Sequence, residues 1–201
     1  MEQHTLEQLV LRQQAYIDLA NLMGRYQYLH TGGQMNVIGR ELFAYELPDA
    51  RCEYGPLGVF GPEKSLAFFD AMTAAFTEGQ GHCTPGLLEL HQITTPVIQV
   101  AGDLKTAKGM WMSTGAILML HDADSETGRS FTWDSGKYAV DFINLNGVWK
   151  SNINSLVPHY AIGRIGFGAP FKCLICSVKP VSENYDTDMM EVWDHFGKLV
   201  I

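Results

Sequence analysis

The side chain with the clearest capacity for chemistry is His91, which lies within the apolar run 87–100 (LLELHQITTPVIQV). The ordinary pKa of an imidazole is about 6.5, so this side chain can both accept and donate a proton near neutral pH. A histidine in a long strand can also be a hydrogen-bonded group at the rim of a sheet. His91 is therefore a candidate general acid–base residue, and a structural position at the rim is the alternative.

A carboxylate on a later strand, Asp134, is a second candidate. Side chains alternate between the faces of a strand, so Asp134, Gly136, Tyr138 and Val140 share one face of the predicted strand 130–145. If Tyr138 faces a cavity, so does Asp134. An apolar setting would then raise the pKa of its carboxyl group and suit it to proton transfer. An exposed acid near a strand end is the alternative.

Aromatic and amide side chains on the neighbouring strands are candidate substrate contacts. Trp111 and Trp133 come from adjacent predicted strands, and alternation could place both in the cavity, with Met110 or Met112 nearby, against a flat hydrophobic ligand. Tyr138 is a further candidate contact if its face of the strand lines the cavity. Asn152, on the last predicted strand, could hydrogen-bond a substrate hydroxyl group. Ordinary core packing accounts for the two tryptophans equally well.

These residues are positioned by four long predicted strands that follow one another along the chain. The strands span 87–100, 104–121, 130–145 and 148–156, and Asn146-Gly147 between the last two is a strong hairpin signal. Consecutive strands of this length form a meander that must curl to bury one face. Because a curled sheet with helices against it encloses a pocket, we expect the functional site there.

Three predicted helices and a brief strand through 52–54 precede the meander. Thr5 and Gln8 form a capping box that opens a helix to about Leu29, a short helix spans 35–43, and Pro62 begins the third helix. The three-to-four spacing of apolar residues predicts a buried face on the first helix: Leu6, Leu9, Val10, Tyr16, Ile17, Ala20 and Met23. This element order predicts an α+β fold with helices packed against one antiparallel sheet.

Composition narrows the classes of partner and compartment. With 201 residues, of which 46% are hydrophobic and 18% charged, the chain can bury a substantial core. A formal net charge of −8 disfavours nucleic acid, and no apolar run reaches the ~18 residues of a membrane span. The four cysteines are too scattered for a disulfide framework, and Cys173-Leu-Ile-Cys176 lacks a second pair for zinc. We expect a cytoplasmic protein with reduced thiols and no metal site.

Several stretches of the sequence resemble a known family. They are Arg25-Tyr26 with Leu42-Phe43-Ala44, followed by 91–103 (HQITTPVIQVAGD), 107–111 (AKGMW), 136–142 (GKYAVDF) and 147–150 (GVWK). In order and spacing they resemble the SnoaL-like branch of the nuclear transport factor 2-like superfamily over about residues 5–157. The resemblance implies a cone-shaped α+β barrel, which we place at 1–158. Residues 159–201 would form a C-terminal extension that acts as a cavity lid or a subunit contact.

The resemblance also implies roles for individual side chains. Dehydratases of this family place a histidine on the first long strand, which matches His91. They place tyrosines near the end of the first helix and on the short strand, which match Tyr28 and Tyr54. Those phenols would position a water molecule or polarise a carbonyl, although a tyrosine that buries its ring and wets its hydroxyl needs no such role. Many members carry an aspartate after the helix-end tyrosine, where this chain has Thr31, so His30 or Asp134 would have to replace it.

The resemblance therefore implies a cofactor-independent lyase that acts on a small hydroxylated aromatic or polyketide-like compound. The reaction would be a dehydration or a deformylating carbon–carbon cleavage, with His91 exchanging the proton. An isomerase, a polyketide cyclase and a non-catalytic small-molecule-binding domain are the alternatives. We also expect a homodimer or homotrimer, a small-molecule substrate, and neither a nucleic acid nor a membrane partner.

Overall fold

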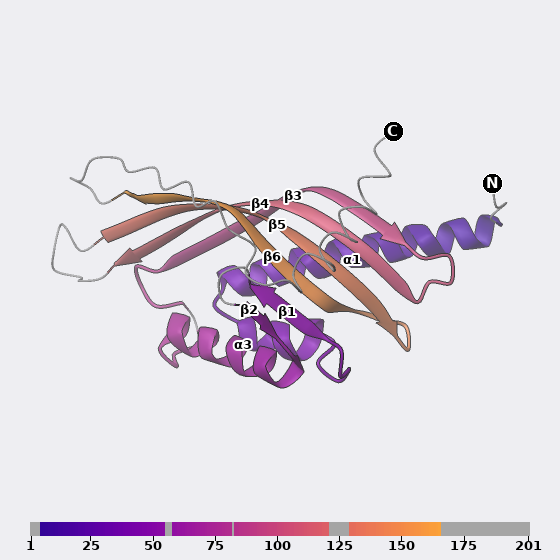
Figure 1. Ribbon diagram of the computed structural model, residues 1–201, viewed down its shortest axis with the longest axis horizontal. Coiled ribbons are helices and arrows are strands. Elements are labelled where there is room, and N and C mark those ends of the chain that lie inside the picture. Colours follow the sequence, from indigo (N-terminus) through magenta and orange to yellow (C-terminus); the bar gives the residue numbers. More distant parts are fainter. Residues whose placement is uncertain (1–4, 55–57, 82, 121–128, 166–201) are drawn as a thin grey trace.

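The computed structural model describes residues 5–54, 58–81, 83–120 and 129–165. The helices are α1 (Leu6–Thr31), α2 (Met35–Val37), the π-helix η1 (Ile38–Leu42) and α3 (Pro62–Thr77). The strands are β1 (Arg51–Tyr54), β2 (Gly58–Phe60), β3 (Leu88–Val100), β4 (Thr106–Leu120), β5 (Arg129–Leu145) and β6 (Val148–Ile165). Their arrangement is shown in Figure 1.

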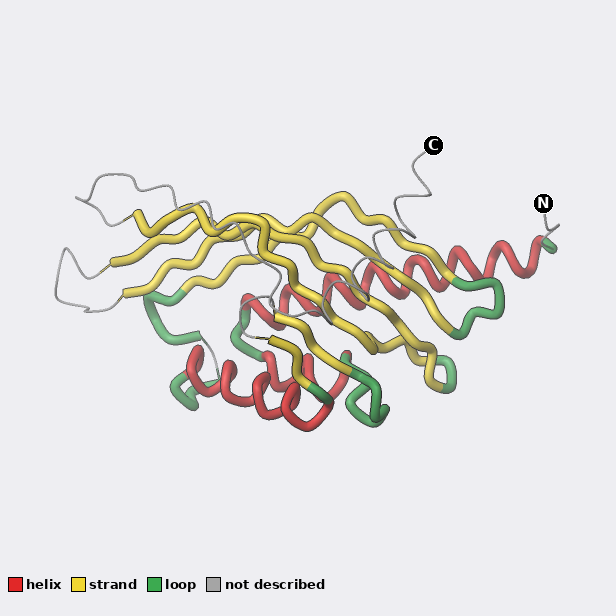
Figure 2. The backbone as a smooth tube through the Cα atoms, in the orientation of Figure 1, coloured by secondary structure: helices red, strands yellow, loops and turns green. Residues whose placement is uncertain are grey.

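The strands form one curved sheet whose order is β2-β1-β6-β5-β4-β3. The pairs β3–β4, β4–β5 and β5–β6 are antiparallel and form the expected meander, whereas β1 runs parallel to β6. The helices among the described residues lie on one side of this sheet, and none of them covers the opposite face of the meander (Figure 2). The architecture is the expected α+β class, and the sheet is an open cone rather than a closed barrel.

Helix α1 begins as predicted but buries a different set of side chains. The Thr5 hydroxyl accepts a hydrogen bond from the Gln8 amide, and the Gln8 side chain accepts one from the Thr5 amide, which completes the capping box. The predicted positions Leu6, Leu9, Val10 and Ile17 are exposed, and the prediction for them is wrong. The first turns of α1 extend past the end of the sheet (Figure 1), so the beginning of the helix has little of the sheet to cover. The buried face begins further along: Ala15, Leu19, Leu22, Met23, Tyr26, Gln27 and His30.

Two other elements differ from the sequence prediction. The predicted helix 35–43 is a short α-helix followed by a π-helical turn that ends at Leu42. The last strand was predicted to end at 156 but continues to Ile165, because the preceding strand is long enough to pair with it from Leu145↔Val148 to Phe131↔Ile165. The turn between these strands is as predicted: both Asn146 (φ 55°) and Gly147 (φ 90°) adopt the left-handed conformation that a tight hairpin requires.

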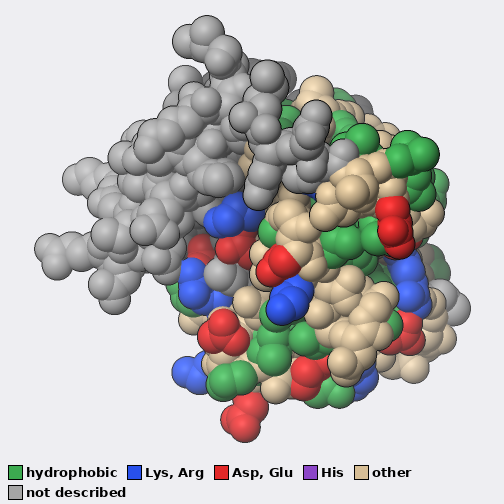
Figure 3. All heavy atoms as spheres, turned by 90° about the vertical axis from the view of Figure 1, so that its right-hand side faces the viewer, with side chains coloured by type: hydrophobic (Ala, Val, Ile, Leu, Met, Phe, Trp, Pro, Cys, Tyr) green, Lys and Arg blue, Asp and Glu red, His purple; other side chains and the backbone are tan. Residues whose placement is uncertain are grey.

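The core lies between the helices and the inner face of the sheet. Its largest fully buried side chains include Tyr26 from α1, Phe69 from α3, and Tyr138 and Phe142 from β5. No helix in the described part of the chain is long and apolar enough to cross a membrane. Figure 3 shows the end of the molecule where α1 begins, and acidic and basic side chains are interspersed there with hydrophobic ones. Among the described side chains visible in that view, the basic ones do not form a continuous surface of the kind that binds nucleic acid.

Candidate active site

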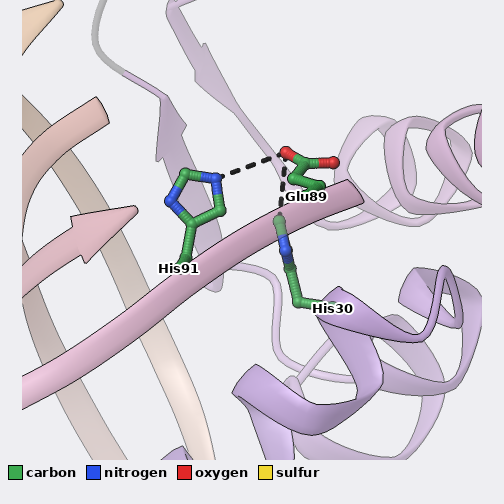
Figure 4. A group of neighbouring side chains, drawn as sticks. All are labelled: His30, Glu89 and His91. Carbon is green, nitrogen blue, oxygen red and sulfur yellow. Dashed lines mark hydrogen bonds and ion pairs between the residues drawn. The ribbon is translucent and has the colours of Figure 1, made fainter. Parts of the chain in front are cut away.

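Three ionisable side chains meet where the end of α1 crosses the beginning of β3. Glu89 and His91 are two residues apart on β3, so strand alternation directs both toward the helices, and His30 reaches them from the last turn of α1 (Figure 4). Nε2 of His91 lies 3.3 Å from Oε1 of Glu89. Nε2 of His30 lies 3.8 Å from the same oxygen, and the two imidazole ring centroids are 4.9 Å apart.

Burial controls the electrostatics of this cluster. The residues are only 4% (His30), 8% (Glu89) and 6% (His91) exposed. Burial lowers the pKa of His30 to about 4; the neighbouring Glu89 opposes this shift and His91 adds to it. His30 is therefore a neutral imidazole near neutral pH. Nδ1 of His30 and Oε2 of Glu89 are buried and have no hydrogen-bond partner among the described residues.

Aromatic rings hold the cluster in place. The ring of Tyr26 stacks on His30 with centroids 6.1 Å apart and meets the edge of Tyr138 at 5.7 Å. Gly115 on β4 pairs with His91, and a Cβ there would lie 2.9 Å from Nδ1 of that histidine. The absence of a side chain at Gly115 thus makes room for the imidazole ring.

Tyr28, which the resemblance matched to a site tyrosine, lies elsewhere. Its side chain is 86% exposed, whereas Tyr26 is buried within the ring contacts of the cluster. Helical geometry explains the difference, because Tyr26 lies three residues after Met23 and four before His30, the spacing of one helix face. Tyr28 falls outside that spacing and points to solvent. The spacing to the buried Met23 was the sequence signal that could have identified Tyr26.

The two tryptophans do not share a cavity wall, so that expectation is wrong. Trp111 is 3% exposed and packs edge-on against Phe142, with ring centroids 6.1 Å apart. Trp133 is 49% exposed. The register between β4 and β5 explains the separation, because Trp111 pairs with Tyr138 whereas Trp133 pairs with Ala116. Positions 111 and 116 have opposite parity in β4 and therefore face opposite sides of the sheet.

The remaining candidates fall outside the cluster or outside the described side chains. The backbone of Tyr54 pairs with Leu156, and that of Asp134 pairs with Gly115, but the side chains of Tyr54 and Asp134 lie outside the described residues. Asn152 lines a different pocket, of about 440 Å³, near the Lys108–Asp141 ion pair. Tyr138 is 1% exposed and reaches the cluster through Tyr26.

Glu89 is the member of the cluster that the sequence analysis missed. The chain lacks the aspartate expected after the helix-end tyrosine, and a carboxylate two residues before His91 on the same strand face stands next to the histidine instead. The signal was the period-two spacing of Glu89 and His91. The three side chains can exchange protons with a substrate, and their ligand atoms, all within 4.8 Å of one another, could also hold a metal ion.

Comparison with known proteins agrees with this architecture. The family model of a SnoaL-like domain matches residues 12–152, so the chain belongs to the SnoaL-like family. Its fold is that of the nuclear transport factor 2-like superfamily, as the sequence resemblance predicted. No curated protein matches the sequence significantly.

Solved structures are similar to this chain in fold. The hexachlorocyclohexane dehydrochlorinase LinA-type3 from Novosphingobium barchaimii shares 14% identity at a TM-score of 0.56, over 81% of this chain and 97% of its own. A protein from Novosphingobium aromaticivorans, provisionally assigned as a scytalone dehydratase, shares 12% identity at a TM-score of 0.54, over 87% of this chain and 100% of its own. The Kfla4162 protein from Kribbella flavida shares 13% identity at a TM-score of 0.57, over 74% of this chain and 93% of its own.

Proposed function

We propose that this protein is a lyase that removes water, by proton transfer at His91, from a small hydroxylated aromatic or polyketide-like substrate. The observation that carries the proposal is the buried pair of His91 and Glu89, whose Nε2 and Oε1 atoms are 3.3 Å apart. A carboxylate beside a histidine fixes the orientation of the ring and stabilises the imidazolium that forms when the histidine takes a proton.

The reaction balances with the residues of the cluster alone. In the tautomer whose Nε2–H donates to Glu89, Nδ1 of His91 carries the lone pair and takes a proton from a carbon next to a carbonyl group. The electron pair of the broken C–H bond forms a C=C bond as the neighbouring C–O bond breaks. The hydroxide that leaves receives the proton back from the imidazolium. The products are an unsaturated ketone and water.

His30 would serve as a hydrogen-bond donor in this scheme. Its Nδ1 atom is buried without a hydrogen-bond partner among the described residues. In the tautomer protonated at Nδ1, this N–H can bind the carbonyl oxygen on which negative charge develops as the proton leaves carbon. A buried donor without a protein partner is costly, so a substrate oxygen that fills the place gains binding energy.

The fold comparisons support an elimination. The names dehydrochlorinase and dehydratase, borne by two of the similar structures, denote reactions that remove hydrogen chloride and water. Both reactions take a proton from one atom and a leaving group from its neighbour. The described side chains of the cluster supply a base and a carboxylate for such a step.

The test is an elimination assay on hydroxylated aromatic and polyketide-like ketols in buffer containing EDTA, followed through the ultraviolet absorption of the new conjugated product. We expect turnover by the wild type and a loss of roughly 10²–10⁴-fold in kcat for His91→Gln, the usual contribution of a general base. Glu89→Gln keeps the shape of the side chain and should lower kcat more than it raises KM.

The matched control is Glu46→Gln, which neutralises a carboxylate that pairs with Lys150 at 2.7 Å and takes no part in the cluster. Its turnover should equal that of the wild type. Full activity in His91→Gln on a substrate that the wild type converts would refute the proposal. If no compound is converted while some raise the melting temperature, the protein is a binding domain and the proposal is wrong.

A further inference from the structure

The same three side chains form a donor set that suits a divalent metal ion. His30 and His91 offer imidazole nitrogens and Glu89 offers a carboxylate oxygen, and these atoms all lie within 4.8 Å of one another. Two histidines and one carboxylate bind zinc in hydrolases and iron in non-haem oxygenases. We propose that the cluster binds one divalent transition-metal ion of the Zn²⁺ or Co²⁺ type, and that the bound ion excludes the proton transfer at His91.

The spacing of the ligand atoms is close to what such an ion requires. Zinc–nitrogen and zinc–oxygen bonds of about 2.0–2.2 Å in a tetrahedral site place neighbouring ligand atoms about 3.3–3.5 Å apart. The distance from Oε1 of Glu89 to Nε2 of His91 is already 3.3 Å, and that to Nε2 of His30 is 3.8 Å. The nitrogen of His30 would have to move closer to both partners on binding, because the three ligand atoms lie within 4.8 Å of one another and a tetrahedral ion needs about 3.5 Å.

The elements that carry the ligands hold them together before any ion binds. Glu89 and His91 stand on one face of β3, and His30 is carried on the last turn of α1, against which the ring of Tyr26 stacks. Preassembly lowers the entropy cost of gathering three side chains around an ion. Three protein ligands leave the fourth tetrahedral position for water or a substrate oxygen.

A buried polar atom of the cluster without a hydrogen-bond partner among the described residues is an independent sign of a ligand. Oε2 of Glu89 is buried and has no hydrogen-bond partner among the described residues. Buried polar atoms are almost always paired, so one that is not calls for an explanation. An ion bound to Glu89 through both oxygens, or a water molecule on that ion, would satisfy Oε2.

The exclusion of proton transfer follows from the tautomer of His91 and rests on the proposed function. An ion on Nε2 takes the lone pair of that atom and displaces the hydrogen that donates to Glu89. The neutral ring then carries its only hydrogen on Nδ1, which has no lone pair left to accept a proton from a substrate. Metal binding and elimination therefore compete for one imidazole.

The experiment measures binding first and activity second. The full chain, stripped with EDTA and dialysed, is titrated with Co²⁺, whose visible absorption reports the coordination of the ion. We expect absorption that saturates at one ion per chain. His30→Gln and Glu89→Gln should each weaken Co²⁺ binding by at least ~10–100-fold. Loss of a group that only orients a metal-binding side chain already costs that much affinity, and these two residues would contact the ion directly. Glu46→Gln should bind like the wild type.

Each result decides the proposal. The proposal would be overturned if Co²⁺ produced no absorption. It would also be overturned if the wild type and both cluster variants bound Co²⁺ equally, because the ion would then be bound elsewhere, for example at Cys173 and Cys176. Circular dichroism identifies a variant that fails to fold, and the other variant then carries the test. Where the elimination assay finds a substrate, Zn²⁺ should inhibit turnover and EDTA should restore it, whereas activation by Zn²⁺ would refute the exclusion. Cobalt binding without any elimination would sustain the metal site and count against the proposed lyase.

Discussion

A single added methyl group at Gly115 should destabilise the protein. This glycine lies on β4 opposite His91, and an ideal Cβ there would lie 2.3 Å from the carbonyl oxygen of Leu90. A carbon–oxygen contact needs about 3.3 Å, so the two strands would have to separate by about 1 Å. Because the atom in the way belongs to the backbone, no side-chain rotation can relieve the contact.

The cost of Gly115→Ala can be estimated from its parts. Overpacking costs about 1–3 kcal/mol, and each strand hydrogen bond that the separation weakens contributes about 0.5–1.5 kcal/mol. Alanine recovers roughly 0.4–1 kcal/mol by restricting the unfolded chain. The free energy of unfolding should therefore fall by about 2 kcal/mol, which lowers the melting temperature by about 4–8 °C in a chain of this size.

The assay is thermal unfolding of the wild type, Gly115→Ala and the matched variant Gly24→Ala. Gly24 lies inside α1, and a Cβ there would meet nothing within 4 Å. Since alanine favours a helix interior over glycine by about 1 kcal/mol, Gly24→Ala should raise the melting temperature. If Gly115→Ala were as stable as the wild type, the close approach of β3 to β4 would be wrong, and with it the space assigned to the His91 ring.

Two further predictions concern ionisable groups outside the cluster. Burial raises the pKa of Asp141 above its ordinary value of 3.8, against the opposing effect of Lys108, so the folded protein binds this proton more tightly than the unfolded chain does. The stability from Asp141 is then present below the unfolded pKa and is lost as pH rises through the folded pKa. The melting temperature of Asp141→Asn should therefore rise relative to that of the wild type as the pH is raised from 4 to 7. If the difference in melting temperature between the two proteins were the same at every pH, the raised pKa of Asp141 would be wrong. Burial also raises the pKa of the Cys52 thiol to about 12, whereas Cys83 is partly exposed. Because the thiolate is the reactive form, iodoacetamide should label Cys83 well before Cys52 in the native protein. Peptide mapping by mass spectrometry measures the two rates, and equal labelling would show that Cys52 is not enclosed.

Much of the fold follows from local sequence signals. Several elements depend only on residues that are neighbours in the sequence. Examples are the start of α1 at the Thr5 capping box, the left-handed hairpin turn at Asn146-Gly147, and the strands formed by the long apolar runs. The position of His91 on the first long strand is equally local, as is the shared strand face of Glu89 and His91. Two-residue alternation in a strand needs no tertiary information.

Other features depended on how the elements pack. The separation of Trp111 from Trp133 follows from the register of β4 on β5. A shift of that register by one residue would bring the two side chains to the same face of the sheet. The exposure of the first turns of α1 follows from where the sheet ends beneath the helix, which the helical spacing of apolar residues does not encode. Apolar residues recur in both halves of α1, but those near its beginning, Leu6, Leu9 and Val10, stay exposed.

The candidate site likewise has features that the sequence sets and features that only the packing of the elements sets. The sequence by itself determined that His91 and Glu89 share a strand face, since alternation depends on one element alone, whereas it placed His30 just beyond the predicted end of the first helix. Only the tertiary structure brought His30 within 3.8 Å of Glu89 and buried all three side chains. The physical reason is that the crossing of α1 over β3 depends on packing across the whole core, while the desolvation that sets the charge of His30 exists only once that core has formed.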